Sequence, residues 1–502
     1  MESIMKKYPF YLLSVLILFN INAESYILQI DMGEKEKSSI LVSLPEDNET
    51  TIPEEIPEEI PENCVTREQL ELMIGNGEDV TQVCTTYITD MSRLFLLNKT
   101  FNQDISQWDV SNVTNMASMF AFSNFNQDIS QWDVSSVTDM SGMFSFSKFN
   151  GYINNWDVSN VINMSRMFSY SPFNQNISNW NVSNVTNMSS IFSGSQFNTI
   201  LDNWDFSNVT DMSRMFSYSK YNRPINNWNT KNVETFEEFL AFSSSFNQPI
   251  SNLDLSSAKT IKGMFKNSTK FNQELSELDV SNVEDFTSAF EGTTYFRNTN
   301  ALKNWNPSSA KNMTRMFYES AFNGEITDWN VSSVTDMTEM FARSNFNQPL
   351  NWNSSNVISF EGFLEQTSYF NKPITLDLSS AITIEAIFQN ASQFNQDISH
   401  WDVSNVKNFS EAFGWTGSFR NPNALKDWNL ASAENTSFMF LSSDFNGDLS
   451  NWNTGNITNM NSMFRQSNFG SDISSWDVGN VIDYDYFSLS SNLQPSQIPN
   501  FN

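Results

Sequence analysis

The chain has 502 residues, with 57 acidic and 27 basic side chains, and its formal net charge is −30. Nucleic acids and anionic membrane surfaces attract lysine and arginine, so this charge argues against both as partners. Neutral or basic proteins, glycans and divalent cations remain the expected partners.

Residues 1–23 are typical of a secretory signal peptide. Lys6 and Lys7 supply the positive start, an apolar run covers residues 11–21, and Ala23 ends a plausible cleavage site. An uncleaved membrane anchor is the alternative, but the run is short for a bilayer span. The C-terminal tail, residues 488–502, is polar and shows no hydrophobic anchor. We therefore expect a secreted or cell-surface protein without membrane insertion after cleavage.

Residues 24–63 are predicted to form an acidic linker rich in proline and glutamate. Within it, residues 26–31 and 39–44 can pair as a hairpin across the turn at Gly33. From residue 53 to 62 proline recurs every fourth residue with glutamates between, which favours an extended, solvated spacer. The spacer either holds the rest of the chain away from a surface or is a plain acidic linker.

Residues 64–100 are predicted to form an N-terminal cap followed by half a repeat. Thr66 and Gln69 match the capping box of a helix, which would end at Gly75 or Gly77. Such a cap would cover the first layer of a repeat array.

Cys64 and Cys84 are the two cysteines of the sequence. In an exported protein we expect them to form a disulfide, which would stabilise the cap by about 3 kcal/mol. Two buried free thiols are the alternative.

One motif fills residues 101–487, first written F-N-Q-D-I-S-Q-W-D-V-S-N-V-T-N-M-A-S-M-F at residues 101–120. Sixteen copies follow one another at spacings of 24 to 26 residues. Their first residues are Phe101, Phe125, Phe149, Phe173, Phe197, Tyr221, Phe246, Phe271, Phe296, Phe322, Phe346, Phe370, Phe394, Phe419, Phe445 and Phe469. Self-similarity at such a period is typical of a solenoid.

The pattern inside one copy changes from that of a strand to that of a helix. Ile105, Trp108 and Val110 have the inward spacing of the short strand in a leucine-rich repeat. The M-x-x-M-F segment that follows has the apolar face of a helical turn. We therefore expect an LRR-like α/β solenoid of about 16 repeats, with short parallel strands on one face and short helices or helical turns on the other. Stacking would place Trp on Trp and Met on Met, and Asn102 and its equivalents would form an internal ladder.

The complete motif resembles the repeats of the BspA-like leucine-rich-repeat surface proteins of bacteria and unicellular eukaryotes. The resemblance covers residues 65–487 and rests on the whole motif rather than on one fragment. Characterised members of that family are mostly secreted or cell-surface adhesion proteins. The resemblance therefore implies exposure and the binding of an extracellular protein or glycan, without identifying the ligand.

A longer repeat lies in the second half of the chain. Phe296 to Trp305 returns as Phe419 to Trp428, which is 419 − 296 = 123 residues later, so a block of five copies is duplicated. Both blocks carry a two-residue extension before the tryptophan. The extension either marks a binding loop on one face or is a harmless inherited insertion.

Aspartate or asparagine directly follows the Trp or Leu of every copy, and stacked carboxylates would repel one another. Calcium bound by a ladder of these residues is one way to offset the repulsion. The ladder would contain Asp109, Asp133, Asp157 and Asp205. Hydrogen bonds to adjacent turns, interspersed asparagines and solvent screening are the other way. The sequence has no compact calcium motif, which favours the second explanation.

No motif in the sequence indicates catalysis. The single histidine, His400, occupies a slot that holds Gln or Asn in other copies and is interpreted as a surface substitution. The acidic residues recur with the repeat, whereas an active site requires a local departure from it. We expect a protein that is not an enzyme and has no cofactor. Adhesion or recognition is the expected function, a structural coat component is the alternative, and a polysaccharide-active enzyme comes third.

Sequons for N-glycosylation are dense, so a glycoprotein is expected if the host is eukaryotic. Most of them arise because S-N-V-T and N-M-S belong to the repeat motif, and coincidence is the stronger reading. They include Asn98, Asn112, Asn163, Asn184, Asn187, Asn208, Asn267, Asn312, Asn390, Asn408 and Asn456.

Overall fold

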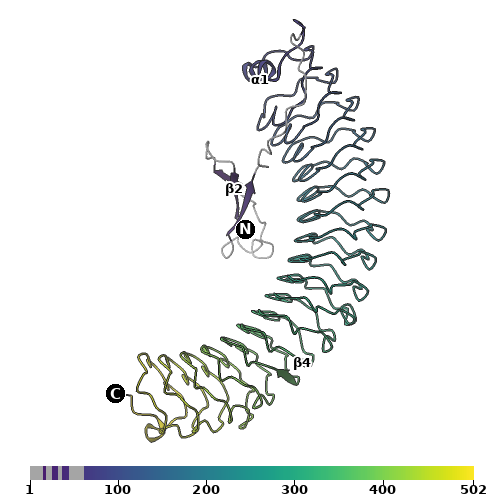
Figure 1. Cartoon of the computed structure of the whole chain (residues 1–502). Coiled ribbons are helices and arrows are strands. Elements are labelled where there is room, and N and C mark those ends of the chain that lie inside the picture. The colour runs from purple at the N-terminus through teal and green to yellow at the C-terminus, as the bar shows by residue number, and fades with distance from the viewer. Residues whose placement is uncertain (1–14, 19–24, 32–36, 44–60, 502) are drawn as a thin grey trace, which may run out of the picture. The chain divides into compact units, whose positions relative to one another are not determined.

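The computed structural model describes residues 15–18, 25–31, 37–43 and 61–501, which belong to two units, Met1–Glu59 and Ile60–Asn502 (Figure 1). In the first unit, β1 (Val15–Leu18), β2 (Ser25–Asp31) and β3 (Lys37–Ser43) form an antiparallel sheet in that order. β2 and β3 confirm the predicted hairpin. β1 lies inside the apolar run predicted for the signal peptide. Most of the acidic spacer, residues 53–60, lies outside the described residues.

The second unit begins with the one α-helix in its described part, α1 (Arg67–Asn76). The Thr66 hydroxyl accepts the backbone N–H of Gln69, and the Gln69 side chain accepts the N–H of Thr66 at 2.8 Å. This confirms the predicted capping box. The helix ends at Gly77, whose left-handed φ of 73° lets its N–H return to the last carbonyls of the helix.

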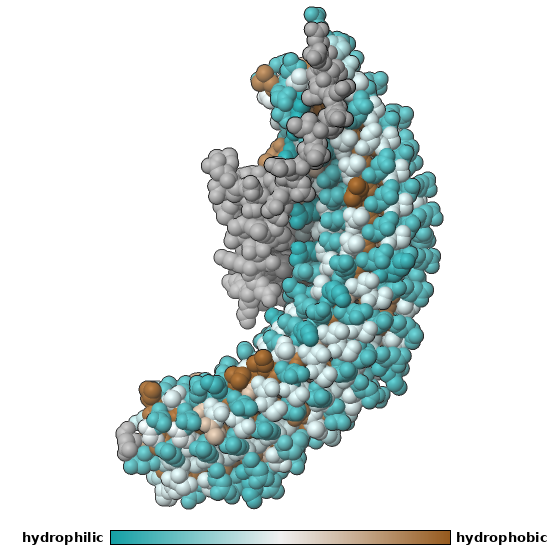
Figure 2. Space-filling model, in the orientation of Figure 1, coloured by the Kyte–Doolittle hydropathy of each residue, from teal (hydrophilic) through white to brown (hydrophobic). Residues whose placement is uncertain are grey.

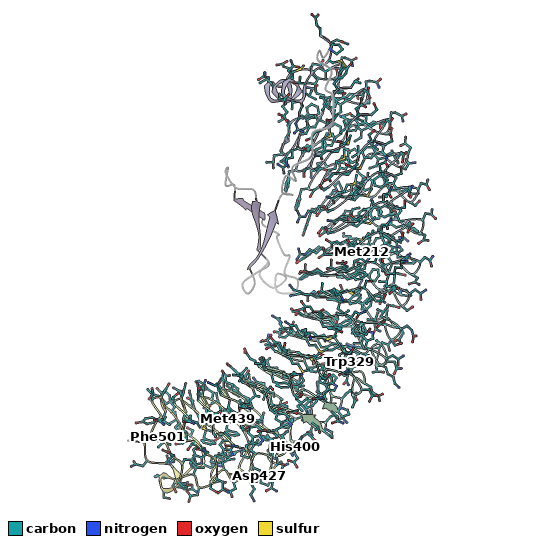
Figure 3. All side chains as sticks on the ribbon, viewed as in Figure 1. Met212, Trp329, His400, Asp427, Met439 and Phe501 are labelled. Carbon is teal, nitrogen blue, oxygen red and sulfur yellow. A yellow bond between two sulfur atoms is a disulfide. The ribbon has the colours of Figure 1, made fainter. Side chains whose placement is uncertain are left out.

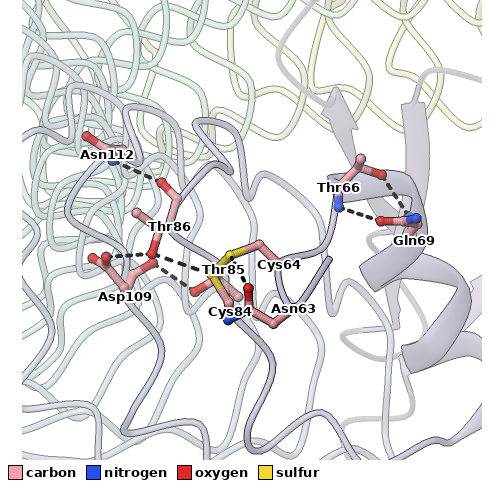
Figure 4. Close-up of a disulfide and its surroundings, with 9 residues drawn as sticks. All are labelled: Asn63, Cys64, Thr66, Gln69, Cys84, Thr85, Thr86, Asp109 and Asn112. Atoms are coloured by element: carbon pink, nitrogen blue, oxygen red, sulfur yellow. Dashed lines mark hydrogen bonds between the residues drawn. A yellow bond between two sulfur atoms is a disulfide. The ribbon is translucent and has the colours of Figure 1, made fainter. Parts of the chain in front are cut away.

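The predicted disulfide joins Cys64 to Cys84 (Figure 4). The cap that it closes covers the start of the core, because Leu70 of α1 is fully buried in the shared hydrophobic cluster. The Arg67 guanidinium ties α1 to the half repeat by donating to the carbonyl of Ser92 at 2.6 Å. Leu70 and Arg67 therefore attach α1 to the first copies.

Residues 61–501 form tandem aromatic-rich copies whose side chains share one hydrophobic core (Figures 1 and 3). Parallel backbone bridges join each copy to the next at one equivalent position, from Asp90 to Asp483. The expected stacking of tryptophans is confirmed where the rings follow one another: the centroids of Trp156 and Trp180 are 6.5 Å apart. The indole N–H of Trp180 donates to the carbonyl of Ile153 in the preceding copy at 3.0 Å. Each copy is thus buried against its neighbours.

The helices predicted on one face do not form in residues 101–487. The M-x-x-M-F segment instead makes consecutive tight turns, in which the N–H of Met119 donates to the carbonyl of Met116 at 3.2 Å. Every second N–H reaches the next copy: Met116 donates to Asp139 at 2.9 Å and Ser118 to Ser141 at 2.7 Å. An α-helix would use these groups within one copy. The turns free them to join neighbouring copies.

Two positions in each copy take a left-handed backbone. In the first copy they are Ser118, with φ of 56°, and Phe122, with φ of 54°. All 29 non-glycine residues with positive φ in the described chain occupy equivalents of these two positions. Ser118 is the third residue of the turn that Met116 and Met119 close, where a type II turn requires positive φ.

The predicted strands form in two copies, as β4 (Leu350–Trp352) and β5 (Ile374–Leu376), which pair in parallel. In a regular copy two residues separate Ile105 from Trp108 and make a turn, with the N–H of Trp108 donating to the carbonyl of Ile105 at 3.1 Å. The two strand copies have one residue there. Because one residue cannot make that turn, the segment extends and pairs instead. The strand prediction is wrong for the other copies.

The C-terminal segment covers the last copy and includes a 3₁₀ turn, η1 (Pro495–Gln497). The N–H of Ile473 donates to the carbonyl of Gln497 at 3.0 Å. The ring of Phe501, labelled in Figure 3, stacks on Tyr484 with centroids 4.4 Å apart. Residues 488–501, interpreted from the sequence as a tail, therefore complete the C-terminal cap.

Candidate interaction surface

Three acidic or amide positions in each regular copy hold tight turns. In the first copy Asp104, Asp109 and Asn115 each accept the backbone N–H of the residue two positions further on, at 2.9 to 3.1 Å. These are Asx turns, in which the side chain replaces a backbone acceptor. The recurring D/N-x-S/T triplets of the motif therefore have a structural role.

The four residues of the predicted calcium ladder hold turns of this kind. They are Asp109, Asp133, Asp157 and Asp205. Asp109 also accepts the hydroxyl of Ser111 at 2.6 Å. It accepts the hydroxyl of Thr86 at 2.8 Å (Figure 4). The hydrogen bond from the Ser111 side chain lowers the pKa of Asp109 most, and the hydrogen bond from the Ser111 backbone N–H is the second cause that lowers it. No group of three or more His, Cys, Asp or Glu residues among those described could hold a metal ion. A backbone N–H donates to each of the four carboxylates, and serine hydroxyls also donate to Asp109 and Asp133.

The predicted asparagine ladder exists, but it lies on the surface. The side-chain oxygen of Asn102 accepts the N–H of Asn126 at 2.9 Å, and Asn126 does the same for Asn150 at 2.9 Å. All three side chains are exposed. The prediction that these asparagines bond from copy to copy is therefore confirmed. The prediction that the ladder is internal is wrong.

Several of the predicted sequons belong to a second amide ladder. Asn184 donates its Nδ2 to the carbonyl of Ser159 at 2.7 Å, and Asn208 donates to Ser183 at 2.7 Å. An N-linked glycan would be attached to this nitrogen. These asparagines join neighbouring copies, and glycosylation stays a prediction.

His400 is exposed on the surface, as its interpretation as a surface substitution requires (Figure 3). It lies near Asp397, whose pKa is lowered mainly by hydrogen bonds from the backbone and side chain of Ser399 and slightly by His400.

The two extensions adopt the same conformation in both blocks. The side chain of Asn298 accepts the N–H of Asn300 at 3.1 Å, and Asn421 accepts that of Asn423 at 3.1 Å. Each extension ends in a buried leucine; Leu302 is fully buried. The extension is therefore a surface turn anchored in the core.

Aromatic rings form a half-buried row at the second left-handed position. Phe122 stacks on Phe146 with centroids 4.6 Å apart, and Phe146 stacks on Tyr170 at 4.6 Å. Tyr218 and Phe242 continue the row at 4.3 Å after Gly194 interrupts it. The faces of these rings cover one another, so their edges remain for contact with a partner.

Charged side chains form a separate row at the first left-handed position, which includes Arg214, Glu238, Arg315 and Glu339. Arg315 lies 3.2 Å from Glu291 and 3.4 Å from Glu339. Near the end of this row, burial and then the charge of Glu385 raise the pKa of Glu411. The row carries both positive and negative charges around Arg315 and only negative charges around Glu411.

Two shallow grooves lie on a different face, along the equivalents of Asn112 and Thr114. The larger has a volume of about 810 Å³ and eleven lining residues, among them Lys311, Thr335, Asn356, Ile358, Ile382 and Lys407. The smaller has a volume of about 500 Å³, and its lining includes Asn208, Thr210, Asn232, Glu234 and Lys259. Apolar residues are scattered over a mostly hydrophilic surface (Figure 2). Ile358 and Ile382 are not isolated in this way, because they occupy the same exposed position in consecutive copies.

Sequence reasoning did not single out the grooves. The available signal is the residue that follows the buried Val113 and its equivalents. It is threonine in the first two copies, but it becomes Lys311, Ile358, Ile382 and Lys407 in later ones. The preceding core position stays Val, Ala or Ile in every copy, so the change from neutral to charged or bulky apolar side chains is confined to the exposed row.

A protein-family model described as "Mycoplasma protein of unknown function, DUF285" matches seven overlapping segments of the chain, residues 68–171, 123–220, 195–301, 294–377, 344–445, 375–464 and 419–497. No curated protein and no solved structure matches the chain. Within the described residues, no helix has the length and apolar character needed to cross a bilayer. The matched segments run without a gap from residue 68 to residue 497, so the chain belongs to the DUF285 repeat family.

Proposed function

We propose that the chain is a secreted or cell-surface protein, without enzymatic activity, that binds an extracellular protein or glycan through side chains displayed on stacked copies. The observation that carries the proposal is the contrast within each copy. Core positions equivalent to Trp108 and Phe120 stay apolar throughout, whereas the exposed position equivalent to Thr114 holds Thr, Ile, Glu or Lys. A constant core with variable exposed rows suits a recognition surface.

In this proposal the copies form one solenoid of turn-rich repeats. The continuous bridges from Asp90 to Asp483 support this arrangement. Binding would then be spread over several copies, and weak contacts would add up through multivalency. The likeness of the motif to LRR-type surface proteins supports adhesion or recognition as its use.

Export is supported by the signal-peptide pattern of residues 1–23. The bridge between Cys64 and Cys84 also supports it, because disulfides persist in oxidising compartments. The competing function is that of a structural component of a coat or extracellular layer, because the same stacked copies could build such a layer without binding a ligand.

The duplicated block allows a deletion that keeps the copies in phase. Removing residues 296–418 joins Tyr295 to Phe419, which is the equivalent of Phe296. A matched control removes residues 101–220, five regular copies, and joins Thr100 to Tyr221. Both variants keep the two caps and lose five copies.

The test immobilises the full chain and both deletion variants and measures binding of candidate host and neighbour cells. We expect saturable binding by the full chain and by the 101–220 deletion, with loss of binding in the 296–418 deletion. Absence of saturable binding, together with ordered self-assembly seen by light scattering, would favour the coat. Glycan turnover that one Asp or Glu substitution abolishes would favour the enzyme.

A further inference from the structure

The larger groove differs in charge from the chain that surrounds it. Its eleven lining residues include Lys311 and Lys407 and no aspartate or glutamate, although acidic residues outnumber basic ones 57 to 27. Ile358 and Ile382 lie between the two lysines, with 49% and 41% of their surface exposed. The groove therefore has a lysine near each end and two isoleucines in the middle.

The smaller groove lies on the equivalent rows and lacks this character. It holds Glu234 and Lys259, one residue of each sign, and no isoleucine. The block duplication makes the comparison direct, because 259 + 123 = 382 aligns Lys259 with Ile382 and 284 + 123 = 407 aligns Glu284 with Lys407. The exposed positions that hold Lys259 and Glu284 in the first block therefore hold Ile382 and Lys407 in the second. A pair of opposite charges in one block corresponds to an apolar residue beside a lysine in the other.

We propose that the larger groove binds an extended peptide segment of a partner protein that has a carboxylate at each end and apolar side chains between. This proposal rests on the proposed recognition function and names its ligand class. The rows of Lys311 and Lys407 are separated by four inter-copy bridges, from Asn312 to Asn408. At about 4.8 Å per step the span is about 19 Å, which about six extended residues cover.

The lining chemistry favours a peptide over an anionic glycan. Hydroxyl groups of a sugar placed on Ile358 and Ile382 would lose their water without gaining partners, whereas apolar side chains would gain burial. Serine and asparagine side chains such as Ser380 and Asn405 line the groove and can bond to a peptide backbone.

One cation of the groove already has a partner. Lys407 Nζ lies 2.7 Å from Glu434 Oε1, and both side chains are more than half exposed. An exposed pair of this kind contributes little, so a ligand carboxylate can replace Glu434. Lys311 has no ion pair among the described residues of the chain.

The test uses the full chain and a fluorescein-labelled hexapeptide with glutamate at both ends and threonine, valine, valine and threonine between them. Fluorescence anisotropy measures its affinity. We expect Lys311→Gln and Lys407→Gln each to weaken binding about 3-fold, in line with an exposed ion pair. Ile382→Thr should weaken it about 5-fold through lost apolar contact. Added salt should reduce the effect of the lysines.

Lys259→Gln is the matched control, because it removes a lysine from the same row in the smaller groove; we expect no change. Ile382→Thr keeps the fold, since threonine is native at this row in other copies. A hexapeptide with glutamine ends should bind more weakly. Equal losses for Lys259→Gln and Lys311→Gln, or no loss for any groove variant, would overturn the proposal.

An anionic tetrasaccharide of uronic acids is the competing probe. If it binds more tightly than the peptide and ignores Ile382→Thr, the ligand is a glycan and the peptide assignment is wrong. If cells bind the immobilised chain while the groove variants bind them normally, recognition stands and this groove is not its site.

Discussion

Replacing Gly194 with alanine tests how tightly the left-handed positions are packed. A Cβ at Gly194 would lie 2.5 Å from carbons of the Tyr170 ring, so the ring must move. Alanine at the φ of 64° costs about 1 kcal/mol. Lost stacking of Tyr170 on Phe146 adds about 1 kcal/mol. We expect the free energy of local opening to fall by about 2 kcal/mol in total.

Two further variants separate the backbone cost from the contact. Gly142 has a φ of 61°, and its Cβ would lie 3.0 Å from the Ser118 hydroxyl, which can rotate away. Gly142→Ala should therefore cost only about 1 kcal/mol. In a Tyr170→Ala background, Gly194→Ala should also cost about 1 kcal/mol, because the ring is gone.

Hydrogen–deuterium exchange over residues 125–220, which include the copies of both glycines, is the suitable assay. Long repeat arrays do not unfold in one step, so a single melting temperature would mix many copies. Equal losses for Gly142→Ala and Gly194→Ala would refute the reasoning. So would a Gly194→Ala loss that is unchanged when Tyr170 is alanine.

Three other perturbations have defined outcomes. Burial raises the pKa of Glu411 above its ordinary value of 4.5, so its contribution to stability is full below pH 4.5 and is lost as the pH rises through the raised pKa. Glu411→Gln should therefore increase exchange protection of the copies around residue 411 at pH 7 and leave it unchanged at pH 4. The Cys64–Cys84 disulfide joins residues 20 positions apart in the sequence. Its reduction should lower the free energy of local opening of the N-terminal cap by about 3 kcal/mol, as measured by hydrogen–deuterium exchange, without affecting distant copies. Asn174→Ala removes the acceptor of the Asn198 N–H and should cost about 1 kcal/mol locally, whereas Asn174→Asp keeps an acceptor oxygen and should cost less; the exchange assay on both variants measures the difference.

The repeat and its core could be predicted because apolar spacing reports burial directly. Trp180 and its neighbours stack as expected, and the capping box at Thr66 formed in full. The helix at Met116 could not be predicted correctly, because two apolar residues three apart suit a type II turn as well as a helical turn. What decides between them is the adjacent copy, which supplies acceptors for alternate N–H groups and is invisible to a local pattern.

The strands show the same limit on a smaller scale. Ile105 and Trp108 have the spacing of a leucine-rich repeat, yet two residues between them suffice for a turn. Removing one of the two residues produces β4 and β5. The groove could not be predicted from any single copy, because it exists only when Ile358 and Ile382 are brought together by stacking.

The left-handed positions constrain how the outer surface can change. Glycine would occupy them without strain, yet large side chains such as Phe146 and Arg315 stand there and touch their counterparts in adjacent copies. Replacing one such residue by another non-glycine residue keeps the cost of the left-handed backbone. It also removes the side-chain contacts with the copies before and after it. Variation there is therefore expected in runs of neighbouring copies, an aromatic stretch or a charged stretch at a time, and substitutions grafted one by one should be tolerated worse than whole stretches moved together.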